Sequence, residues 1–468
     1  MKIMLLVPDG VAVRNYVYSD FVEELIECGF EVVLYHQIPD AAIDEIKKVK
    51  GTIVSDIVKI PEFKENFFGR ILKESIVYAR LLQNKSKLKN DTILLFWNRN
   101  QKGFKRLTLL RISEFFGYFL SKSYALILKF EKVYDNTALH NSVTKVIEMD
   151  LLKIKPDYIL NLHQRAVISA PIINVAKQLS IPTGTVIFSW DNIPKARLVS
   201  KYDHYFVWSN LMKNELHLLY PEINSNQVFV TGTPQFEFYF KEHFLQSKAD
   251  FFQKFGLSLD KKTICFSAND TSSPYEQIYF EDLCEELMTV NETDRPQILF
   301  RKCPVDKTNR FDAVLEKYKE LVFPIEPDWR IQSGDTSFVY IYPSYDDFEL
   351  LANTVLHSDV VINLGSTMAH DFAVFNKPCL YLNYDPVSNS IFKVKEVYQF
   401  QHFRSMKELN AVGWIDSKSD FIPKIQAALC NPDSVGSDRL QWMQRIVNYP
   451  LQESSANLAK EIKRCTSV

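Results

Sequence analysis

The feature that most constrains the fold is a repeated pairing of a short apolar run, ending in polar residues or glycine, with a helix-like pattern. The first pairing is KIMLLVPDG with an amphipathic stretch that ends at Gly29, and the next apolar run, FEVVLYH, follows directly. Strands that are apolar along their whole length are typical of parallel sheets covered by helices on both faces. The alternation therefore predicts an α/β protein built from βαβ units.

The alternation occurs in two series, separated near residues 240–262 by a stretch rich in Lys, Phe and Gln. The first series continues with PDYILNLHQRA, TGTVIFSWDN, YDHYFVWSN and NQVFVTGTPQFEFY, and the second contains TICFSAND, QILFRKCP, SFVYIYPSYDD, DVVINLGST and PCLYLNYD. A chain of 468 residues is also too long for one comfortable core. We predict two facing doubly wound domains, at residues 1–245 and 246–435, followed by C-terminal helix at residues 436–468.

Residues 62–150 interrupt the first series and are helical by pattern. The stretch from Lys85 to Tyr134 is basic and aromatic, with few acids. Basic residues interleaved with Phe, Leu and Tyr suit an anionic membrane surface, so we predict a helical insertion with possible peripheral membrane contact. The alternative is an ordinary helical hairpin with a solvated basic face.

Composition excludes several classes of protein. A net charge of −2 argues against a general nucleic-acid binder. Seven widely spaced cysteines without a CxxC motif indicate reduced cysteine in a cytosolic protein, with no metal site. We expect no transmembrane helix, because no run of about 18 uncharged apolar residues occurs. The P-loop, GxGxxG, HExxH and GxSxG motifs are also absent.

Ligands of doubly wound sheets bind outside the carboxyl ends of the strands, so we examine the residues at those ends. In the second domain, Gly365, Ser366 and Thr367 end an apolar strand and begin a helix. Free backbone N–H groups and the helix dipole suit a phosphate there, although an ordinary helix cap is the alternative. Asp371, one turn further on, can accept two ribose hydroxyls, or it can be an acid stabilised by the same dipole.

Three further strand ends of the second domain carry candidate binding residues. Arg301 and Lys302 end QILFRKCP and can neutralise a diphosphate, unless they form only a solvated basic rim. Ser267 ends the first strand of the domain, where its hydroxyl can meet the phosphate. The turn with Tyr342, a proline and Ser344 can cradle a nucleobase through backbone contacts.

The first domain offers Asp9, His163 and Asp191 at three strand ends. A carboxylate or an imidazole at such a position can remove the proton from a sugar hydroxyl. Each can instead be an N-cap or a residue that braces a loop. We predict that the three lie on one wall of a cleft between the domains.

With these residues identified, the chain resembles glycosyltransferases of the GT-B fold. It is similar to bacterial surface-polysaccharide glycosyltransferases and to CDP-glycerol glycerophosphotransferase-like proteins. The segments that carry the resemblance are SWDN (189–192), VTGTPQF (230–236), RKCP (301–304) and SDVVINLGSTMAHDFAVFNKP (358–378). The matching acid of the family is commonly Glu where this chain has Asp371, and Cys303 replaces a histidine of the R-x-H-P pattern. Residues 62–150 have no match.

The resemblance implies two Rossmann-like domains in the GT-B arrangement, with the C-terminal helix crossing back to the first domain. It implies a metal-independent glycosyltransferase that needs no cofactor and moves a sugar from a nucleotide-sugar donor, expected to be a UDP-sugar, to a glycan or lipid-linked acceptor. The expected process is bacterial surface-polysaccharide synthesis for the cell envelope. The expected location is the cytoplasm, at the inner face of the cell membrane. The sugar, the acceptor and the stereochemistry stay open.

Three other functions fit the same pattern. A CDP-glycerol-type glycerophosphotransferase differs only in its donor, and a UDP-sugar 2-epimerase shares the fold but is usually shorter and lacks a long helical insertion. A non-enzymatic alternative is a two-domain module that closes on a ligand, which needs the cleft but no base. A transfer or donor-hydrolysis assay distinguishes the module from the enzymes.

Overall fold

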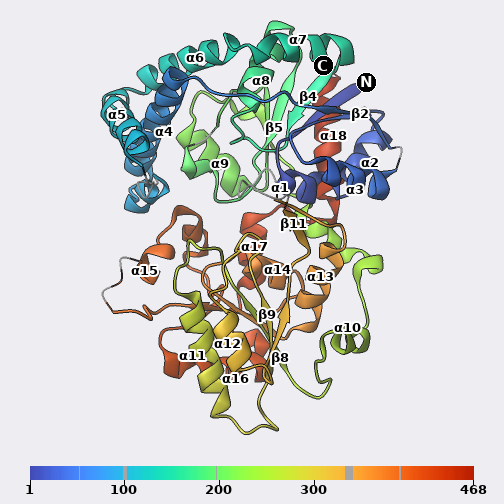
Figure 1. The fold of residues 1–468 in the computed structure, drawn as a ribbon, viewed down its shortest axis with the longest axis vertical. Coiled ribbons are helices and arrows are strands. Elements are labelled where there is room, and N and C mark those ends of the chain that lie inside the picture. Colours follow the sequence, from blue (N-terminus) through green and yellow to red (C-terminus); the bar gives the residue numbers. More distant parts are fainter. Residues whose placement is uncertain are drawn as a thin grey trace.

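The computed structural model describes residues 1–51, 53–97, 103–196, 198–331, 341–388, 390 and 392–467. Two α/β domains lie one above the other in Figure 1, each built around a twisted parallel sheet. The first sheet has seven strands in the order β3-β2-β1-β4-β5-β6-β7. These strands are β1 (Lys2–Val7), β2 (Glu31–His36), β3 (Val54–Lys59), β4 (Tyr158–Asn161), β5 (Thr183–Val186), β6 (His204–Val207) and β7 (Val228–Val230).

The second sheet has six strands in the order β10-β9-β8-β13-β14-β15, and all of its pairings are parallel. Its strands are β8 (Thr263–Ser267), β9 (Gln297–Arg301), β10 (Val322–Ile325), β13 (Val360–Asn363), β14 (Cys379–Leu382) and β15 (Gly413–Ile415). In both sheets the chain starts in the middle, builds outwards to one edge and then returns to build the other half. This is the doubly wound topology, so the predicted fold class is confirmed.

Helices cover both faces of each sheet, which explains why the inner strands are buried along their whole length. Around the first sheet lie α1 (Gly10–Ala12), α2 (Phe21–Glu27), α3 (Asp40–Lys50), α8 (Ser169–Gln178) and α9 (Asn210–Leu219). The second domain contains α10 (Lys248–Phe255), α11 (Glu276–Met288), α12 (Asp312–Lys317), α13 (Asp347–His357), α14 (Met368–Val374), α15 (Val394–Val397) and α16 (Phe421–Cys430).

Among the strands that the sequence analysis missed, three lie at the edge of a parallel sheet. Strands β3, β10 and β15 are only partly buried. An edge strand has one neighbour and little cover, so it does not need the continuous apolar run by which the inner strands were recognised.

The run SFVYIYPSYDD was expected to be a strand of the second sheet, and this prediction is wrong. Its described part forms β12 (Ile341–Pro343), which pairs antiparallel with β11 (Trp329–Ile331) in a separate ribbon. The ribbon lies against the first domain at Gly10. A Cβ atom at Gly10 would lie 2.1 Å from the carbonyl oxygen of Ile341, so only glycine permits this approach.

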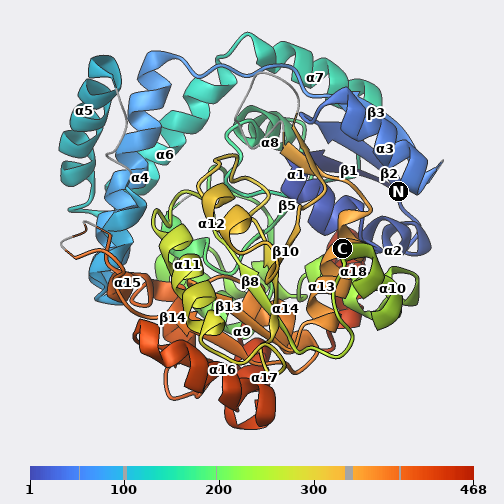
Figure 2. The same ribbon diagram turned by 60° about the horizontal axis from the view of Figure 1, so that its bottom comes forward.

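The described part of the predicted insertion contains four α-helices at the periphery of the first domain in Figures 1 and 2, and the last of them packs into the core of that domain. They are α4 (Phe67–Leu88), α5 (Phe104–Leu120), α6 (Tyr124–Leu139) and α7 (Val143–Ile154).

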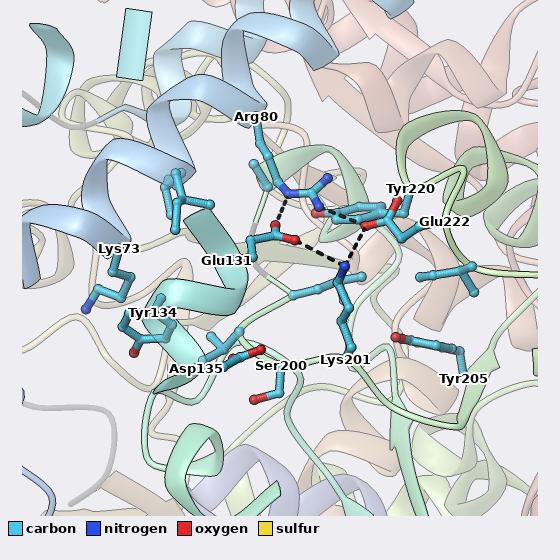
Figure 3. A pocket seen from close by; sticks show the side chains of 16 residues that line it. Lys73, Arg80, Glu131, Tyr134, Asp135, Ser200, Lys201, Tyr205, Tyr220 and Glu222 are labelled. Carbon is cyan, nitrogen blue, oxygen red and sulfur yellow. Dashed lines mark hydrogen bonds and ion pairs between the residues drawn. The ribbon is translucent and has the colours of Figure 1, made fainter. Parts of the chain in front are cut away.

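A buried ion network fixes the insertion to the first domain (Figure 3). Arg80 of α4 bonds Glu131 of α6 at 2.5 Å and Glu222, after α9, at 2.9 Å, and Lys201 approaches both acids. The cavity beside this network has a volume of only about 40 Å³. Since the charges are paired with one another and the space holds little more than water, we regard the network as a structural anchor.

The insertion also reaches the second domain. The side-chain amide of Asn90 donates to the carbonyl oxygen of Gln399 at 3.1 Å, and Arg404 donates to that of Leu88 at 2.7 Å. The rings of Phe96 and Phe400 stack at 5.3 Å. The insertion therefore spans the two domains on one side of the molecule.

The chain returns to the first domain after the second sheet, as expected. Helix α17 (Arg439–Ile446) lies between the domains, and α18 (Ser454–Thr466) lies beside α2, close to the N-terminus (Figure 1). Glu237 holds the start of α18, because its carboxylate accepts from the backbone N–H of Ser455 at 2.5 Å and from its hydroxyl at 2.6 Å. None of the described helices is both long and apolar enough to span a membrane.

Candidate functional site

A cleft of about 330 Å³ lies where the carboxyl ends of the two sheets face each other. Residues of both domains line it. The first domain contributes Val11, Arg14, Asn15, Phe188, Ser189, Trp208 and Gln235, and the second contributes Ser267, Asn269, Arg301, Lys302, Trp329, Asp347, Ser366, Thr367 and Asp371, among others. Six predicted binding residues are therefore in one cavity: Ser267, Arg301, Lys302, Ser366, Thr367 and Asp371.

The strand order explains why these residues meet. In the second sheet β8 lies between β9 and β13, so Ser267 at the end of β8 has Arg301 on one side and the turn after β13 on the other. In the first sheet β1 pairs with β4, which brings the residues after β1 next to those after β4. Both places are the points where the strand order reverses, and ligands of doubly wound sheets bind there.

Arg301 is the buried cation of the cleft. Its Nη2 donates to both carboxylate oxygens of Asp347, at 3.0 and 3.1 Å. Burial would raise the pKa of Asp347, but the charge and hydrogen bond of Arg301 hold it below its ordinary value. The other nitrogen, Nη1, is buried and has no partner among the described residues. A buried donor without a partner is costly, so an anion bound beside it would be stabilised.

Lys302 also lines the cleft, and its amine donates to the carbonyl oxygen of Thr308. This contact fixes its stem, and Lys302 forms no ion pair among the described residues. Lys302 thus adds a positive charge beside the Arg301–Asp347 ion pair.

The turn after β13 has fewer free donors than its sequence predicts. Gly365 has a φ of +62°, which favours glycine. The N–H of Ser366 donates to Asn363 Oδ1 at 2.8 Å, and that of Met368 donates to Ser366 Oγ at 3.4 Å. Helix α14 is also only seven residues long. The turn can contribute hydroxyls to a phosphate site, but Arg301 has to supply most of the positive charge.

Asp371 faces the cleft from α14, as predicted, but it already has a partner. The hydroxyl of Tyr239 donates to its Oδ1 at 2.7 Å. Burial raises the pKa of Asp371, while the Tyr239 hydrogen bond and the charges of Arg14 and Arg301 act in the opposite direction. A ribose would therefore have to share this carboxylate with Tyr239, so the ribose assignment remains a prediction.

Asp9 and His163 form a hydrogen-bonded pair on the first domain. His163 Nδ1 bonds Asp9 Oδ2, and Asp9 Oδ1 accepts the N–H of Ala12 at 3.0 Å as the cap of α1. Burial would raise the pKa of Asp9, but His163 and the N–H groups of Ala12 and Val11 hold it below its ordinary value. Asn161 fixes the loop by bonding both the N–H and the carbonyl of His163.

The second ring nitrogen of His163 points away from Asp9 and is not engaged. Nε2 is buried and has no hydrogen-bond partner among the described residues. His163 is not itself among the residues that line the cleft, and neither are Asp9 and Asp191, so the predicted wall of these three residues is wrong. The His163 ring lies 4.2 Å from that of Phe188, which does line the cleft. An Asp that accepts from Nδ1–H leaves Nε2 as a proton acceptor, which is the arrangement a general base requires.

Asp191 does not share this arrangement. Its carboxylate accepts from Ser189 at 2.7 Å and from Asn192 at 2.8 Å, and it forms an ion pair with Lys195. Although burial opposes ionisation, the charges of Lys195 and His402 and these hydrogen bonds keep its pKa far below the ordinary value. The geometry therefore matches the loop-bracing alternative more closely than a base.

Tyr342 and Ser344 do not line the cleft, so the predicted nucleobase cradle does not fit their placement. Tyr342 lies in the ribbon that contacts Gly10, and Ser344 is fully buried, with its hydroxyl on Asp328. The reason is the antiparallel pairing of β12, which takes this segment out of the second sheet.

Several cleft residues were absent from the predicted site. Arg14 and Asn15 come from a π-helical turn at Val13–Val17, a conformation that is frequent at functional sites. Asp347 and Trp329 are joined by a 2.9 Å hydrogen bond from the indole N–H. For Arg14 the signal was its place after β1, but Asp347 could be recognised only from its contact with Arg301.

Solved structures share this architecture over nearly the whole chain. The UDP-GlcNAc 2-epimerase of Methanocaldococcus jannaschii is 12% identical, with a TM-score of 0.54 over 99% of this chain and 100% of that one. The UDP-GlcNAc 2-epimerase of Neisseria meningitidis, solved with UDP-GlcNAc, is 13% identical, with a TM-score of 0.51 over 99% and 100%. A glycosyltransferase of Rickettsia africae is 11% identical, with a TM-score of 0.52 over 100% and 98%.

These likenesses define the class of architecture: the chain has the GT-B fold, with two Rossmann-like domains facing each other across a cleft. At such low identity they establish the fold alone. No protein-family model matches the chain, and no curated protein matches it.

Proposed function

We propose that the protein is a glycosyltransferase that moves a sugar from a nucleotide-sugar donor to an acceptor hydroxyl. The observation that carries the proposal is that each domain has a buried nitrogen without a hydrogen-bond partner among the described residues. Arg301 Nη1 is a buried donor without a partner, and His163 Nε2 is a buried acceptor without a partner. A leaving diphosphate needs the first and an attacking hydroxyl needs the second.

The donor would lie on the second domain. Its diphosphate would contact Arg301, Lys302 and the hydroxyls of Ser267, Ser366 and Thr367, and its ribose would approach Asp371. Arg14 reaches the same cleft from the first domain, so closing the domains would add a second guanidinium. Neutralising the leaving group in this way does not by itself require a metal ion.

In the proposed reaction, His163 Nε2 removes the proton from the acceptor hydroxyl while the oxygen attacks the anomeric carbon. The bond between that carbon and the diphosphate oxygen breaks, and the nucleoside diphosphate leaves with the bonding pair. Asp9 stabilises the charged imidazole through Nδ1–H. Because the Phe188 ring lies against His163, the acceptor has to replace part of that contact.

Replacing His163 by Gln tests the base. We expect kcat to fall by about 100- to 10,000-fold, because general-base catalysis contributes about that much. Nucleotide affinity should change little, since His163 lies on the acceptor side. A thermal-shift screen with UDP, GDP, CDP and CMP identifies the nucleotide first, and His140→Gln, on the exposed end of α6, is the matched control. Unchanged turnover in the His163 variant would remove the base assignment.

A UDP-sugar 2-epimerase is the second candidate, because two of the solved structures with this architecture carry that activity in their names. The two reactions differ in whether an acceptor is needed. Incubation of the protein with UDP-GlcNAc alone, followed by NMR of the sugar, would reveal an epimer without acceptor. A CDP-glycerol donor would be recognised by selective stabilisation with CDP in the thermal-shift screen.

We also propose that helix α5 contacts an anionic membrane. Its buried residues face the rest of the insertion, while large apolar side chains on the other side are exposed, up to 85% for Phe104. These exposed residues are Phe104, Leu107, Phe115, Phe116, Tyr118 and Phe119. Lys105 and Arg111 on the same helix, and Lys122 just after it, supply positive charge that matches anionic lipid headgroups.

Flotation with vesicles tests this surface. Wild-type protein should float with anionic vesicles more than with neutral ones, and a variant with Phe115, Phe116 and Phe119 replaced by Ser should not float. Equal flotation of the two proteins would exclude α5 as the contact. A glycan or lipid-linked acceptor, a role in envelope polysaccharide synthesis and a location at the cytoplasmic face of the membrane are parts of this proposal.

A further inference from the structure

A second cavity, here called the basic pocket, lies between the insertion and the first domain. Its volume is about 330 Å³, similar to that of the cleft. Helix α4 contributes Arg70 and Glu74, helix α5 contributes Arg106, and the segment between them contributes Trp97. The first domain contributes Arg165 and Lys195, from the loops after β4 and β5. None of these residues entered the predicted site.

The charge in the basic pocket is unbalanced. Four cationic side chains face one carboxylate, that of Glu74. Lys195 is paired with Asp191, and Arg165 donates to Asn192 at 3.2 Å, so their positions are fixed by the first domain. Arg70 and Arg106 are exposed and form no ion pair with any residue that the structure describes. Such a surplus of positive charge in a concave site attracts anions.

The same loops of the first domain connect the basic pocket with the cleft and with His163. In the loop after β4, Arg165 follows His163 by two residues. In the loop after β5, Ser189 lines the cleft and Lys195 lines the basic pocket, and Asp191 bonds both of them. The proximity of these residues along both loops places the basic pocket on the His163 side of the cleft, opposite the residues of the second domain.

We propose that the basic pocket is an anion subsite of the acceptor, which makes the acceptor a phosphate- or diphosphate-bearing molecule. This inference rests on the proposed function, because it places the acceptor hydroxyl at His163. Arginine side chains bind phosphate oxygens through charge-assisted hydrogen bonds. Arg70 and Arg106 form no ion pair with a described residue, so their guanidinium groups can bind such oxygens. The indole of Trp97 in the wall adds an apolar surface for the part of the acceptor next to the anion.

The test is calorimetric titration of the full-length protein with inorganic pyrophosphate in the presence of saturating UDP. UDP fills the donor cleft, so the remaining pyrophosphate binding reports the basic pocket. We expect Arg70→Gln with Arg106→Gln to weaken this binding about tenfold or more while leaving UDP affinity unchanged. Both residues are exposed, so the variant is expected to fold, and its melting temperature checks this.

The matched control is Lys129→Gln with Lys132→Gln on α6, which removes the same charge outside the basic pocket. If this control weakens pyrophosphate binding as much as the arginine variant does, the effect is general electrostatics and the proposal is wrong. Absence of pyrophosphate binding to UDP-saturated wild type would overturn it as well.

Dodecyl diphosphate distinguishes two sources of the anion. Tighter, Arg70- and Arg106-dependent binding of the alkyl compound would support a lipid-linked acceptor, and equal binding of the two compounds would support a water-soluble one. Failure of every nucleotide to bind would instead refute the proposed function. In that event, arginine-dependent pyrophosphate binding would still identify the basic pocket as an anion site.

Discussion

Replacing Arg301 by Gln should affect nucleotide binding and stability in separable ways. The change removes a guanidinium whose Nη2 bonds both oxygens of Asp347 and whose Nη1 has no partner. Loss of a charge-assisted hydrogen bond to a diphosphate costs about 1.5–3 kcal/mol. At 1.4 kcal/mol per factor of ten, the dissociation constant of UDP should rise by about 10- to 150-fold.

The same substitution leaves Asp347 without its cation. Breaking a buried ion pair costs about 3–5 kcal/mol, and the lower value applies because Asp347 also accepts from the N–H of Asp328 and the indole of Trp329. Asp347→Asn is the matched control, since it breaks the same ion pair but keeps the guanidinium. It should lose similar stability in chemical denaturation and retain UDP affinity within about threefold.

Calorimetric titration of UDP into both variants, at a temperature where each remains folded, measures the difference. Unchanged UDP affinity in the Arg301 variant would refute the diphosphate assignment. Equal losses of UDP affinity in the two variants would mean that the Arg301–Asp347 ion pair maintains the structure of the cleft and that Arg301 does not bind the diphosphate directly.

Two further predictions concern the contact that holds α18 to the first domain and the contact of the ribbon with Gly10. Burial raises the pKa of Glu237 from 4.5 to about 7, so the folded protein binds its proton more tightly than the unfolded chain, and stability should fall by about 3 kcal/mol as pH rises from 4.5 to 8. Glu237→Gln can still bond Ser455 and should flatten this profile in urea titrations, whereas an unchanged slope would contradict the assignment. Gly10→Ala should destabilise the protein by about 1–3 kcal/mol, because the new Cβ would meet Ile341 backbone at 2.1 Å. A variant as stable as the wild type in the same titration would show that the ribbon can move away from residue 10 at little cost in free energy.

The fold could be predicted from the sequence because inner strands of a parallel sheet are apolar along their length. The same signal fails at sheet edges, where β3, β10 and β15 need less cover. It also fails for β12, whose apolar residues are buried by pairing with β11 and by contact with the first domain, not by helices on two faces. Periodicity alone does not distinguish these kinds of burial.

The candidate site could be predicted only one residue at a time. Asp9 and His163 were each recognisable at a strand end, but their hydrogen bond depends on the pairing of β1 with β4, which the sequence does not specify. Lys195, four residues after Asp191, was the local sign that this acid is neutralised. The basic pocket had no local sign, because Arg70 and Arg106 meet Arg165 only after the insertion has docked.

The insertion's contacts with residues 399–404 have a thermodynamic consequence. If the domains close on a donor, they must either break the contacts of Asn90 and Phe96 or carry the insertion with them. Phe96 also lines the basic pocket, so either outcome alters that pocket. A donor that changes anion affinity by some factor must have its own affinity changed by the same factor when the anion binds. The affinity for the donor then depends on whether the anionic acceptor is bound, and the affinity for the acceptor depends on the donor in the same way.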